Sequence, residues 1–442
     1  MVKLSGLFSR LSPVRVAVIG DFMRDTYTTG KGKRVSPEAP VIVLQVQNEE
    51  SRPGGAGNVV LNLVSLGAEV VAIGRVGHDI AGKSIVEALM QEGVNTDGMI
   101  FQSRYTTPVK NRLIADSQQL IRVDFETISP IPEHVEQQIV EQLPTLLQGV
   151  DVIAISDYGK GLLSRSLLMT VIEMARSKEI PVIVDPKGED FTKYQGATVL
   201  KPNLQEAYAA AQLSREVPLD QVAEAIFRKV SVDMLMITRS ESGISLFTRD
   251  KKQYDFPVRS KEVIDVTGAG DTVLAMISVA LGNELDLKYG AQLANIAAGI
   301  AIERLGCARI TLSDLANRLL EYDVDNKVFD EEHLFALQQA LKNKRYGVLG
   351  LYSSQGMSTA LFKSIRQLAS RDPDMKLIVY IRDPEPDEEF VSLLSSLTEV
   401  DFVVLQCESL KTLCEIIHPH EVFLMENDQL IVLDHFKALL PS

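Results

Sequence analysis

The sequence predicts an α/β protein whose larger domain is built on a doubly wound, mostly parallel sheet, followed by a smaller α/β domain. Short β-branched runs alternate with helical patterns along most of the chain, which indicates βαβ units. The alternation stops in an acidic stretch at residues 321–335 and resumes after residue 345. The length of 442 residues is also about three times that of a typical domain, so more than one domain is expected.

Six short apolar runs predict the buried strands of the main sheet: residues 14–19, 70–73, 150–155, 182–184, 198–200 and 234–237. Helical patterns lie between them, at residues 56–66, 82–91 and 163–177. Right-handed crossovers between parallel strands place ligands at the carboxyl ends of the strands. We therefore expect the functional side chains in the loops that follow these strands.

One early segment departs from this pattern. Residues 36–48 contain Pro37 and Pro40, then alternate at period two through VIVLQVQ, and no helix follows them. Such alternation is typical of a strand outside a fully covered parallel sheet. The sequence therefore predicts a small β lid at about residues 34–50, which is also the expected surface of a homodimer.

The second domain repeats the strand–helix alternation on a smaller scale. The segments YGVLGLY, KLIVYI, DFVVLQ and EVFLM predict strands, and helical patterns separate the first three. Roughly 100 residues are enough for one small α/β domain. We assign residues 1–320 to the first domain, 321–342 to a linker and 343–442 to the second domain.

Composition and charge exclude several classes of partner. Lys and Arg number 45 against 59 Asp and Glu, a net charge of −14, whereas a nucleic-acid surface needs cations that neutralise phosphates. No stretch approaches the ~20 apolar residues of a membrane helix. Three cysteines, Cys307, Cys407 and Cys414, form neither an even set nor a CxxC pair. We expect a cytoplasmic protein with no nucleic-acid or membrane partner.

The segment DVTGAGDT at residues 265–272 carries the sharpest chemical signal. Gly268, Ala269 and Gly270 allow a tight turn that aims backbone N–H groups outward at the start of a helix, an anion hole for a transferring phosphoryl group. Asp271 follows, where a carboxylate can take the proton of an attacking hydroxyl. The alternative is a glycine-rich turn in which Asp271 only caps the helix.

Other polar groups follow strands on the same predicted sheet edge. The segment GGAGN at residues 54–58 opens a helix, and its asparagine can bond a sugar hydroxyl. Asp21 follows the first strand, where a carboxylate suits the hydroxyls of a polyol. Asn203 and Glu206 follow another strand and could order the water shell of Mg²⁺ near phosphates. Residues 238–243 follow a further strand and could hold nucleotide phosphate or ribose.

A rival interpretation is a P-loop nucleotidase. Residues 77–84, GHDIAGKS, match the pattern G-x-x-x-x-G-K-[ST] between a strand and a helix. The apolar run at residues 152–157, which ends in an aspartate, is similar to the strand that accompanies a P-loop. This interpretation leaves the GGAGN and DVTGAGD segments without a role, so we favour the first one.

The GGAGN and DVTGAGD segments resemble the two signatures of the ribokinase-like (PfkB) family of carbohydrate kinases, and the resemblance covers residues 10–315. The segments SPEAPVIVLQVQ, RPGGAGNV, QQLIRVDFE, SDYGKG and DPKG are similar to one branch of that family. That branch phosphorylates D-glycero-β-D-manno-heptose 7-phosphate at O1 on the way to ADP-heptose for the lipopolysaccharide core. The resemblance implies a ribokinase-like fold, ATP and Mg²⁺.

The same resemblance implies a role for each matching residue. Asp271 would be the general base, and the anion hole would be formed by Gly268, Ala269 and Gly270. The sugar-phosphate site would be lined by Asp21, Gly54, Gly55, Asn58, Lys110, Arg122 and Asp157. ATP would be surrounded by Lys201, Asn203, Glu206, Thr238, Ser240, Gly243 and Asn295, with Glu206 holding Mg²⁺ through water. A substrate that already carries a phosphate needs cations such as Lys110 and Arg122; the alternative is that both are solvated strand-end charges.

The second domain resembles the cytidylyltransferase-like adenylyltransferases, which have a Rossmann-like nucleotidyltransferase fold and are fused to such kinases in many relatives. That family needs an HxGH motif after its first strand, and here GVLGLY leads into SSQGMSTALF without a histidine. We therefore expect this nucleotidyltransferase-like domain to be catalytically inactive. Two further readings of the whole chain stay open: a kinase for another phosphosugar or a nucleoside, and a non-catalytic assembly protein.

Overall fold

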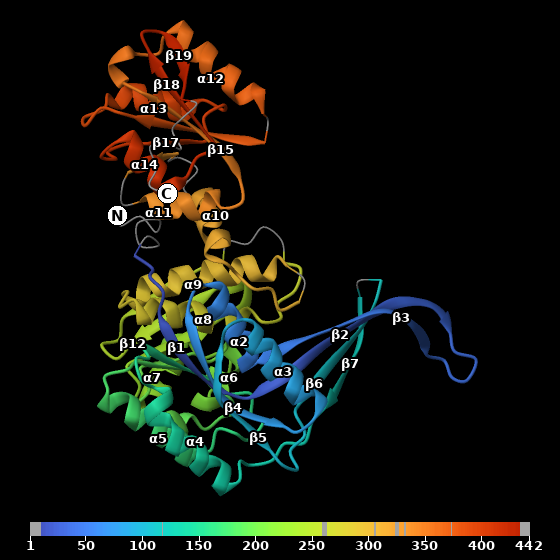
Figure 1. Ribbon diagram of the computed structural model, residues 1–442. Coiled ribbons are helices and arrows are strands. Elements are labelled where there is room, and N and C mark those ends of the chain that lie inside the picture. Colours follow the sequence, from blue (N-terminus) through green and yellow to red (C-terminus); the bar gives the residue numbers. More distant parts are fainter. Residues whose placement is uncertain are drawn as a thin grey trace. The chain divides into compact units, whose positions relative to one another are not determined.

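The computed structural model describes residues 10–116, 118–258, 263–304, 306–322, 327–330, 333–372 and 374–433. The chain divides into two compact units, one formed by Ser12–Thr311 and the other containing the chain from Leu312 onward (Figure 1). The sequence had placed the end of the first domain at residue 320. The difference arises because helix α10 (Leu312–Tyr322) belongs to the second unit.

The first unit is built on a nine-stranded sheet in the order β13-β12-β11-β10-β9-β8-β1-β4-β5. The strands from β5 to β11 in that order are parallel, and β12 and β13 add an antiparallel edge. The strands are β1 (Arg15–Gly20), β4 (Glu69–Gly77), β5 (Asn95–Gln102), β8 (Val152–Ser156), β9 (Val182–Asp185), β10 (Val199–Leu200), β11 (Met234–Thr238), β12 (Ile244–Thr248) and β13 (Gln253–Phe256). The doubly wound prediction is confirmed, and all six predicted strands are present.

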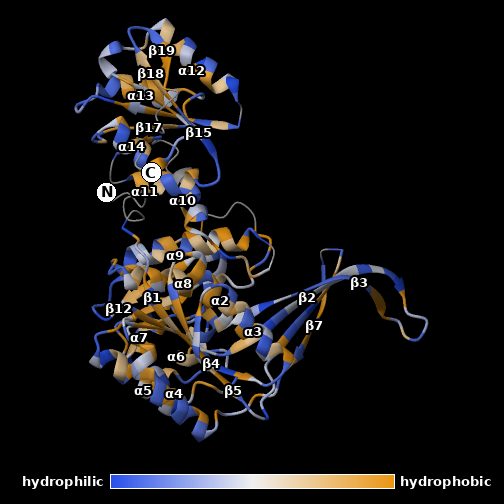
Figure 2. Cartoon of the chain, viewed as in Figure 1, coloured by the Kyte–Doolittle hydropathy of each residue, from blue (hydrophilic) through white to orange (hydrophobic). Residues whose placement is uncertain are grey.

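Helices cover both faces of this sheet. They are α2 (Ala56–Ser65), α3 (Ile80–Gln91), α4 (Glu133–Leu146), α5 (Arg165–Ser177), α6 (Leu204–Ala211), α7 (Leu219–Lys229), α8 (Ala269–Gly282) and α9 (Leu287–Ile302). Ala17 and Ile19 of β1 pack into one core with residues of α4 to α7. Helices α2 and α8 also contact β1. Both faces of the central strands are therefore apolar (Figure 2). Within the described part of the chain, no helix is long and apolar enough to cross a membrane.

A separate four-stranded sheet projects from this unit as a lid (Figure 1). Its order is β3-β2-β6-β7, with β2 (Phe22–Val35), β3 (Ile42–Gly55), β6 (Val109–Ala115) and β7 (Gln118–Phe125). The lid is larger than the predicted residues 34–50, and residues 36–41 only connect two strands. The sequence missed β2, which pairs with β3 on one side and, in parallel, with β6, a partner distant in the chain, on the other.

The second unit contains a six-stranded sheet in the order β14-β17-β16-β15-β18-β19, parallel except for β19. Its strands are β14 (Val328–Phe329), β15 (Arg345–Leu351), β16 (Met375–Ile381), β17 (Phe402–Val404), β18 (Glu421–Glu426) and β19 (Gln429–Val432). Its further helices are α11 (Leu334–Leu341), α12 (Thr359–Arg371), α13 (Glu388–Ser396) and α14 (Leu410–Ile417). The described part of the predicted linker is not a linker, because β14 pairs with β17 and α11 packs into the core.

Candidate active site

Asp271 lies in the first turn of α8, at the sheet edge where β1, β8 and β9 end. The carboxylate is buried, and its two oxygens have different partners. The side-chain amide of Asn58 donates a hydrogen bond of 2.7 Å to Oδ2. The hydroxyl of Tyr158 donates one of 2.7 Å to Oδ1. Two donors from separate parts of the fold therefore fix the orientation of this carboxylate.

The turn before Asp271 requires glycine at its tightest point. Gly268 has φ +81°, and a Cβ atom there would lie 2.8 Å from Nδ2 of Asn58 and 3.3 Å from Sγ of Cys307. Asp265 stabilises the turn by accepting the N–H groups of Thr267 and Gly306, each at 2.9 Å. No side chain caps the start of α8, so N–H groups there can bind an anion, although that of Ala269 donates to the carbonyl of Val266 at 3.3 Å.

The surroundings of Asp271 adjust its acidity. Burial is the largest influence and raises the pKa of Asp271 to about 6, with the hydrogen bonds from Asn58 and Tyr158 opposing it. The nearby Asp185 carboxylate also raises this pKa, and the Lys201 ammonium lowers it. A general base works best when its pKa is near the pH at which the protein operates. Asp271 is thus an ionisable group suited to accept a proton near neutral pH.

Lys201 and Asp185 form a buried ion pair beside the same turn. Their charged atoms are 2.9 Å apart, and the Lys201 side chain is 2% exposed. A Cβ atom on Gly270 would lie 3.7 Å from Nζ of Lys201 and 4.0 Å from Oδ2 of Asp185. The ion pair therefore places the ammonium of Lys201 next to the predicted anion hole, with the Asp185 carboxylate balancing its charge. Asp185 ends β9 within the DPKG segment and was not among the site residues predicted from the sequence.

The GGAGN segment is the turn that joins lid strand β3 to helix α2. Gly55 has φ +58°, and a Cβ atom on Gly54 would lie 2.0 Å from Oδ2 of Asp25. Asp25 in turn forms an ion pair of 2.6 Å with Arg112 on lid strand β6. The two glycines therefore let the base of the lid pack closely, and the helix that follows carries Asn58 to Asp271. Arg112 was not among the site residues predicted from the sequence.

Asp21 and Asp157 were expected to line the sugar-phosphate site, but their carboxylates have protein partners. Oδ2 of Asp21 accepts the N–H groups of Tyr158 at 3.0 Å and Lys160 at 2.9 Å. Asp157 pairs with Lys193 at 2.6 Å and accepts the hydroxyl of Tyr194 at 2.7 Å. In this structure both carboxylates hold the loop after β8 in place.

Lys110 and Arg122 come from neighbouring lid strands. Lys110 is opposite Asp124 in the pairing of β6 with β7, and Arg112 is opposite Arg122. These side chains share one face of the sheet, because paired residues and alternate residues lie on the same side. Nζ of Lys110 lies 5.5 Å from the centre of the Tyr158 ring, and Arg122 forms an exposed ion pair of 2.9 Å with Asp124. The lid thus presents a cluster of cations, of which Lys110 faces the ring of Tyr158, a donor to Asp271.

Asn203 and Glu206 form a capping box at the start of α6. Oδ1 of Asn203 accepts the N–H of Glu206 at 2.9 Å, and Oε2 of Glu206 accepts the N–H of Asn203 at 3.1 Å. Glu206 also pairs with Lys187 at 2.8 Å, a residue that the sequence analysis did not include. An isolated bridge joins Asn203 to Thr238 at the end of β11. These residues therefore form one group at the carboxyl ends of β10 and β11.

The remaining predicted nucleotide residues lie further along the chain. Ser240 and Gly243, with φ of +51° and +85°, form the turn between β11 and β12. Asn295 lies on α9, and its side-chain amide donates to the carbonyl of Pro257 at 2.9 Å. The turn is thus adjacent to the Asn203 group, whereas Asn295 is held by a different segment.

The P-loop interpretation is contradicted by the structure of residues 77–84. Asp79 caps α3 by accepting the N–H of Gly82 at 2.7 Å, and the N–H of Gly77 donates to Oγ1 of Thr107 at 2.8 Å. In a P-loop the backbone N–H groups of this segment point at phosphates, and the lysine reaches them. Here two of those groups already have protein partners, and Lys83 is exposed on α3.

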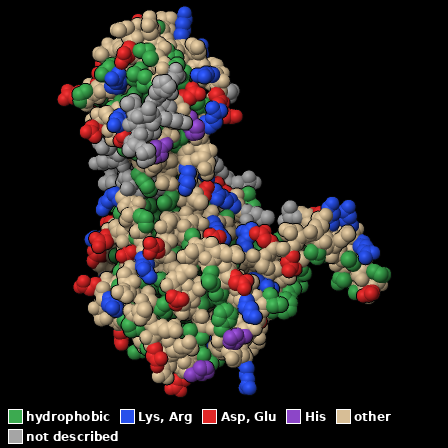
Figure 3. All heavy atoms as spheres, in the orientation of Figure 1, with side chains coloured by type: hydrophobic (Ala, Val, Ile, Leu, Met, Phe, Trp, Pro, Cys, Tyr) green, Lys and Arg blue, Asp and Glu red, His purple; other side chains and the backbone are tan. Residues whose placement is uncertain are grey.

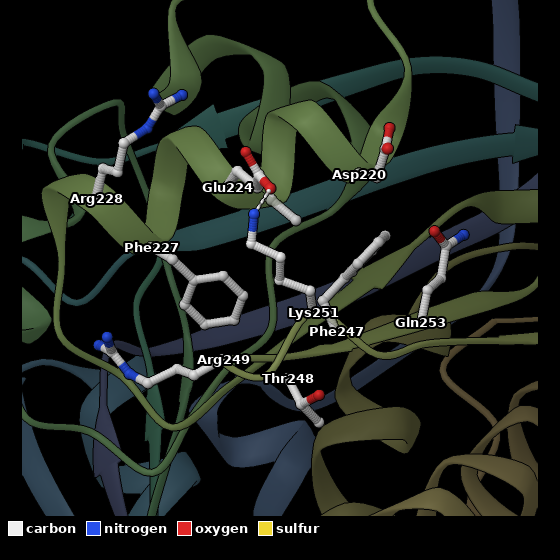
Figure 4. A pocket seen from close by; sticks show the side chains of 10 residues that line it. Asp220, Glu224, Phe227, Arg228, Phe247, Thr248, Arg249, Lys251 and Gln253 are labelled. Carbon is white, nitrogen blue, oxygen red and sulfur yellow. Dashed lines mark ion pairs between the residues drawn. The ribbon is translucent and has the colours of Figure 1, made fainter.

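A cavity of about 400 Å³ lies elsewhere, between α7 and β12 (Figure 4). Phe227 and Phe247 line it, and Glu224 pairs with Lys251 at 2.7 Å beside them. It opens at the opposite end of the sheet from Asp271, because Thr248 in its wall pairs with the first residue of β11. It contains none of the predicted site residues, so the strand-end cluster around Asp271 is the candidate active site.

Known proteins resemble this chain in sequence and in fold. Residues 14–315 match the family described as pfkB family carbohydrate kinase. The chain is 41% identical over 345 residues to "Bifunctional protein HldE" of Trichlorobacter lovleyi, covering 77% of this chain and 70% of that protein. It is 36% identical over 435 residues to the protein of the same name from Syntrophotalea carbinolica, covering 91% and 85%.

Solved structures share the fold of the first unit. Phosphofructokinase-2 from Escherichia coli, in complex with potassium, superposes with a TM-score of 0.59 at 17% identity, covering 70% of this chain and 99% of that chain. Ribokinase from Arabidopsis thaliana, complexed with ribose and ATP, gives 0.55 at 18% identity with the same coverage. The match over residues 14–315 and the identity to the two relatives show that the chain belongs to the pfkB family of carbohydrate kinases.

Proposed function

We propose that this carbohydrate kinase transfers the γ-phosphoryl group of ATP to O1 of D-glycero-β-D-manno-heptose 7-phosphate, giving the 1,7-bisphosphate. The observation that carries the proposal is Asp271, fixed by Asn58 and Tyr158 at the open end of α8. The similarity of several segments to the heptose 7-phosphate kinase branch supports the choice of sugar. The product would serve the synthesis of ADP-heptose for lipopolysaccharide.

The proposed reaction is an in-line phosphoryl transfer. Asp271 takes the proton of the O1 hydroxyl, the oxygen forms a bond to the γ-phosphorus, and the bond from that phosphorus to the ADP oxygen breaks. Negative charge on the transferring group is stabilised by the N–H groups at Gly268, Ala269 and Gly270 and by the ammonium of Lys201. The position of Lys201, close to Gly270, supports this role.

The residues around the proposed ATP site fit a hydrated Mg²⁺. Glu206 offers carboxylate oxygens at the start of α6, and its partner Lys187 has a side chain that is 52% exposed, so the pair can open. Oxygen ligands and retained waters are what Mg²⁺ prefers. We propose that Glu206 holds the ion through water, where it would neutralise charge on the nucleotide. The nucleotide itself would be bound by Asn203, Thr238, Ser240, Gly243 and Asn295.

The cations of the lid support a phosphorylated substrate. A sugar without phosphate needs no ammonium or guanidinium partner, whereas a phosphate ester does. Lys110 is half-buried beside Tyr158, and burial, with Lys160 nearby, lowers the pKa of its ammonium. An incoming phosphate would relieve this crowding of positive charge. Arg122 has an exposed partner in Asp124, which a phosphate could replace.

The same lid cations would accept a different phosphosugar, which is the nearest alternative. A non-catalytic assembly role is disfavoured because Asp271 and Lys201 both lie beside the Gly268–Gly270 turn. The decisive experiment is an ATP-consumption screen over phosphosugars, free sugars and nucleosides, with the product identified by phosphorus NMR. Turnover with heptose 7-phosphate well above that with every other compound is the expected result, and preference for another acceptor would overturn the choice of sugar.

We propose that the second unit is inactive as a nucleotidyltransferase. A cavity of about 740 Å³ opens after β15 and β16, where a Rossmann-like domain binds its ligand. Four carboxylates are among the residues that line it: Asp383, Glu385, Asp387 and Glu389. No Lys, Arg or His belongs to the described lining, whereas a triphosphate needs positive charge. The relatives' name "Bifunctional protein HldE" indicates two activities, and we assign only the kinase activity to this chain.

We further propose that two copies of the chain associate through the lid. Five apolar lid side chains are each more than half exposed: Val35, Ile42, Val46, Ile121 and Phe125. Hydrophobic and basic side chains are visible along the projecting lid (Figure 3). Exposed apolar side chains gathered on one surface are typical of protein interfaces. Sedimentation of the wild-type chain as a dimer, and of the Ile121→Glu variant as a monomer, is the expected result.

A further inference from the structure

Tyr158 connects three elements around the proposed base. Its hydroxyl donates to Oδ1 of Asp271 at 2.7 Å, and its backbone N–H donates to Asp21 at 3.0 Å. Its ring faces the ammonium of Lys110 on lid strand β6, 5.5 Å from the ring centre. Tyr158 lies in the loop after β8 and was not among the site residues predicted from the sequence. Its backbone is thus fixed at the end of β1, its ring contacts the lid, and its hydroxyl reaches Asp271.

We propose that Tyr158 is the positioning residue of Asp271, holding one carboxylate oxygen so that the carboxylate faces the acceptor hydroxyl. This inference rests on the proposed role of Asp271 as the base. The terminal torsion of an aspartate is broad, so one hydrogen bond leaves the plane of the carboxylate free to turn. Asn58 holds Oδ2 from α2, and Tyr158 holds Oδ1 from the loop after β8. With both donors present the carboxylate has one orientation, which a reacting group requires.

The hydrogen bond from Tyr158 also favours the ionised form of Asp271. The groups that act on Asp271 come from several elements: the Asn58 amide and the Tyr158 hydroxyl donate to it, Asp185 and Lys201 act through their charges, and the Cys307 thiol lies beside the Gly268 turn. Burial, followed by the charge of Asp271, raises the pKa of Tyr158 well above its ordinary value. Tyr158 therefore remains a donor throughout the pH range in which the base titrates.

The test compares two tyrosine variants that lose the same atom. Tyr158→Phe removes the bond to Asp271, and Tyr208→Phe removes a bond of equal length, 2.7 Å, from Tyr208 on α6 to the carbonyl of Val217. The pH dependence of kcat/KM is measured for each with saturating ATP and heptose 7-phosphate as the varied substrate. In Tyr158→Phe the acid limb should move up by about 1 to 2 pH units, the scale of one hydrogen bond to a charged group. In Tyr208→Phe it should stay at the wild-type pH.

A second variant should shift the acid limb in the opposite direction, and it keeps the shape of the side chain. Replacing Tyr158 by a fluorotyrosine makes the hydroxyl a stronger donor, so the acid limb should move to lower pH. A purely structural role for Tyr158 would lower activity equally at all pH values and leave both limbs in place. If the acid limb does not move in an active Tyr158→Phe or fluorotyrosine protein, the role given to Tyr158 is wrong, and the proposed function still stands. A wild-type chain that phosphorylates no acceptor would overturn the proposed function, and this inference with it.

Discussion

The side-chain amide of Asn58 donates a hydrogen bond of 2.7 Å to Asp271, although 213 positions separate the two residues in the sequence. The bond joins the helix that follows the GGAGN turn to the helix that follows the DVTGAGD turn. Gly268 lies next to the same amide, and a Cβ atom at this position would lie 2.8 Å from Nδ2 of Asn58. The two glycine-rich segments of the sequence are therefore parts of one site.

We predict that Gly268→Ala lowers kcat by about 10- to 100-fold, because the new Cβ displaces Asn58 from the base and orientation accounts for effects of this size. Gly93→Ala is the matched control, since Gly93 also has positive φ, at +76°, but a Cβ there meets nothing within 4 Å. Both variants carry the strain of a left-handed residue, and Gly268→Ala adds the close contact with Asn58, so its unfolding midpoint should fall further than that of Gly93→Ala. Equal kcat values in the two variants would show that the contact with Asn58 is unimportant.

Arg122→Ala tests the phosphate on the acceptor. We expect KM for heptose 7-phosphate to rise by roughly 10- to 100-fold, which corresponds to losing a charge-assisted bond, with KM for ATP unchanged. Lys33→Ala, on exposed lid strand β2, is the control and should leave both constants as they are. Dephosphorylated heptose should be a poor acceptor for the wild-type protein. Equal use of the free sugar and its phosphate would contradict the substrate class.

The Lys83→Ala variant distinguishes ATP binding near Asp271 from ATP binding by a P-loop at residues 77–84. Since Lys83 is exposed on α3 and the N–H groups of Gly77 and Gly82 are already bonded, we expect less than about a 5-fold change in kcat/KM. A P-loop lysine contacts the β- and γ-phosphates, and its loss would abolish nucleotide turnover. Steady-state kinetics with varied ATP provide the measurement, and a collapse of ATP binding would restore that interpretation.

The second unit should transfer no nucleotide. Given ATP and heptose 1-phosphate, the full-length chain is expected to release no pyrophosphate and to form no ADP-heptose, because the cavity after β15 and β16 is lined by carboxylates. The apolar cores of this unit suggest a part in assembly or stability instead. A coupled pyrophosphate assay with an intact nucleotidyltransferase as positive control makes the measurement. Pyrophosphate release that depends on heptose 1-phosphate would contradict this account of the domain.

Local sequence was enough to predict six of the nine strands of the main sheet and the turn before Asp271. The strands are continuous β-branched runs, and the turn depends on adjacent residues such as Gly268 and Gly270. The extent of the lid was not predictable in this way, because β2 pairs not only with β3 but also with the distant strand β6, where Asp25 is opposite Lys110. That pairing exists only in the folded chain.

The roles of the strand-end carboxylates illustrate the same limit. Asp21, Asp157 and Asp185 each follow or end a strand, and the sequence gives no means of telling them apart. In the structure Asp21 accepts backbone N–H groups, Asp157 pairs with Lys193, and Asp185 pairs with Lys201 beside the Gly270 turn. Tyr158 was missed because a tyrosine after a strand carries no signal until its hydroxyl is seen to reach Asp271.

The central claim is that Asp271 is the base of a kinase acting on a sugar phosphate, and one comparison tests it most directly. Wild-type and Asp271→Asn proteins are incubated with ATP, Mg²⁺ and heptose 7-phosphate, and phosphorus NMR follows the new phosphate at O1. We predict the 1,7-bisphosphate from the wild type and a rate at least ~10²-fold lower from Asp271→Asn, with ATP affinity by calorimetry nearly unchanged. Formation of the bisphosphate at a near-wild-type rate by Asp271→Asn would contradict the account.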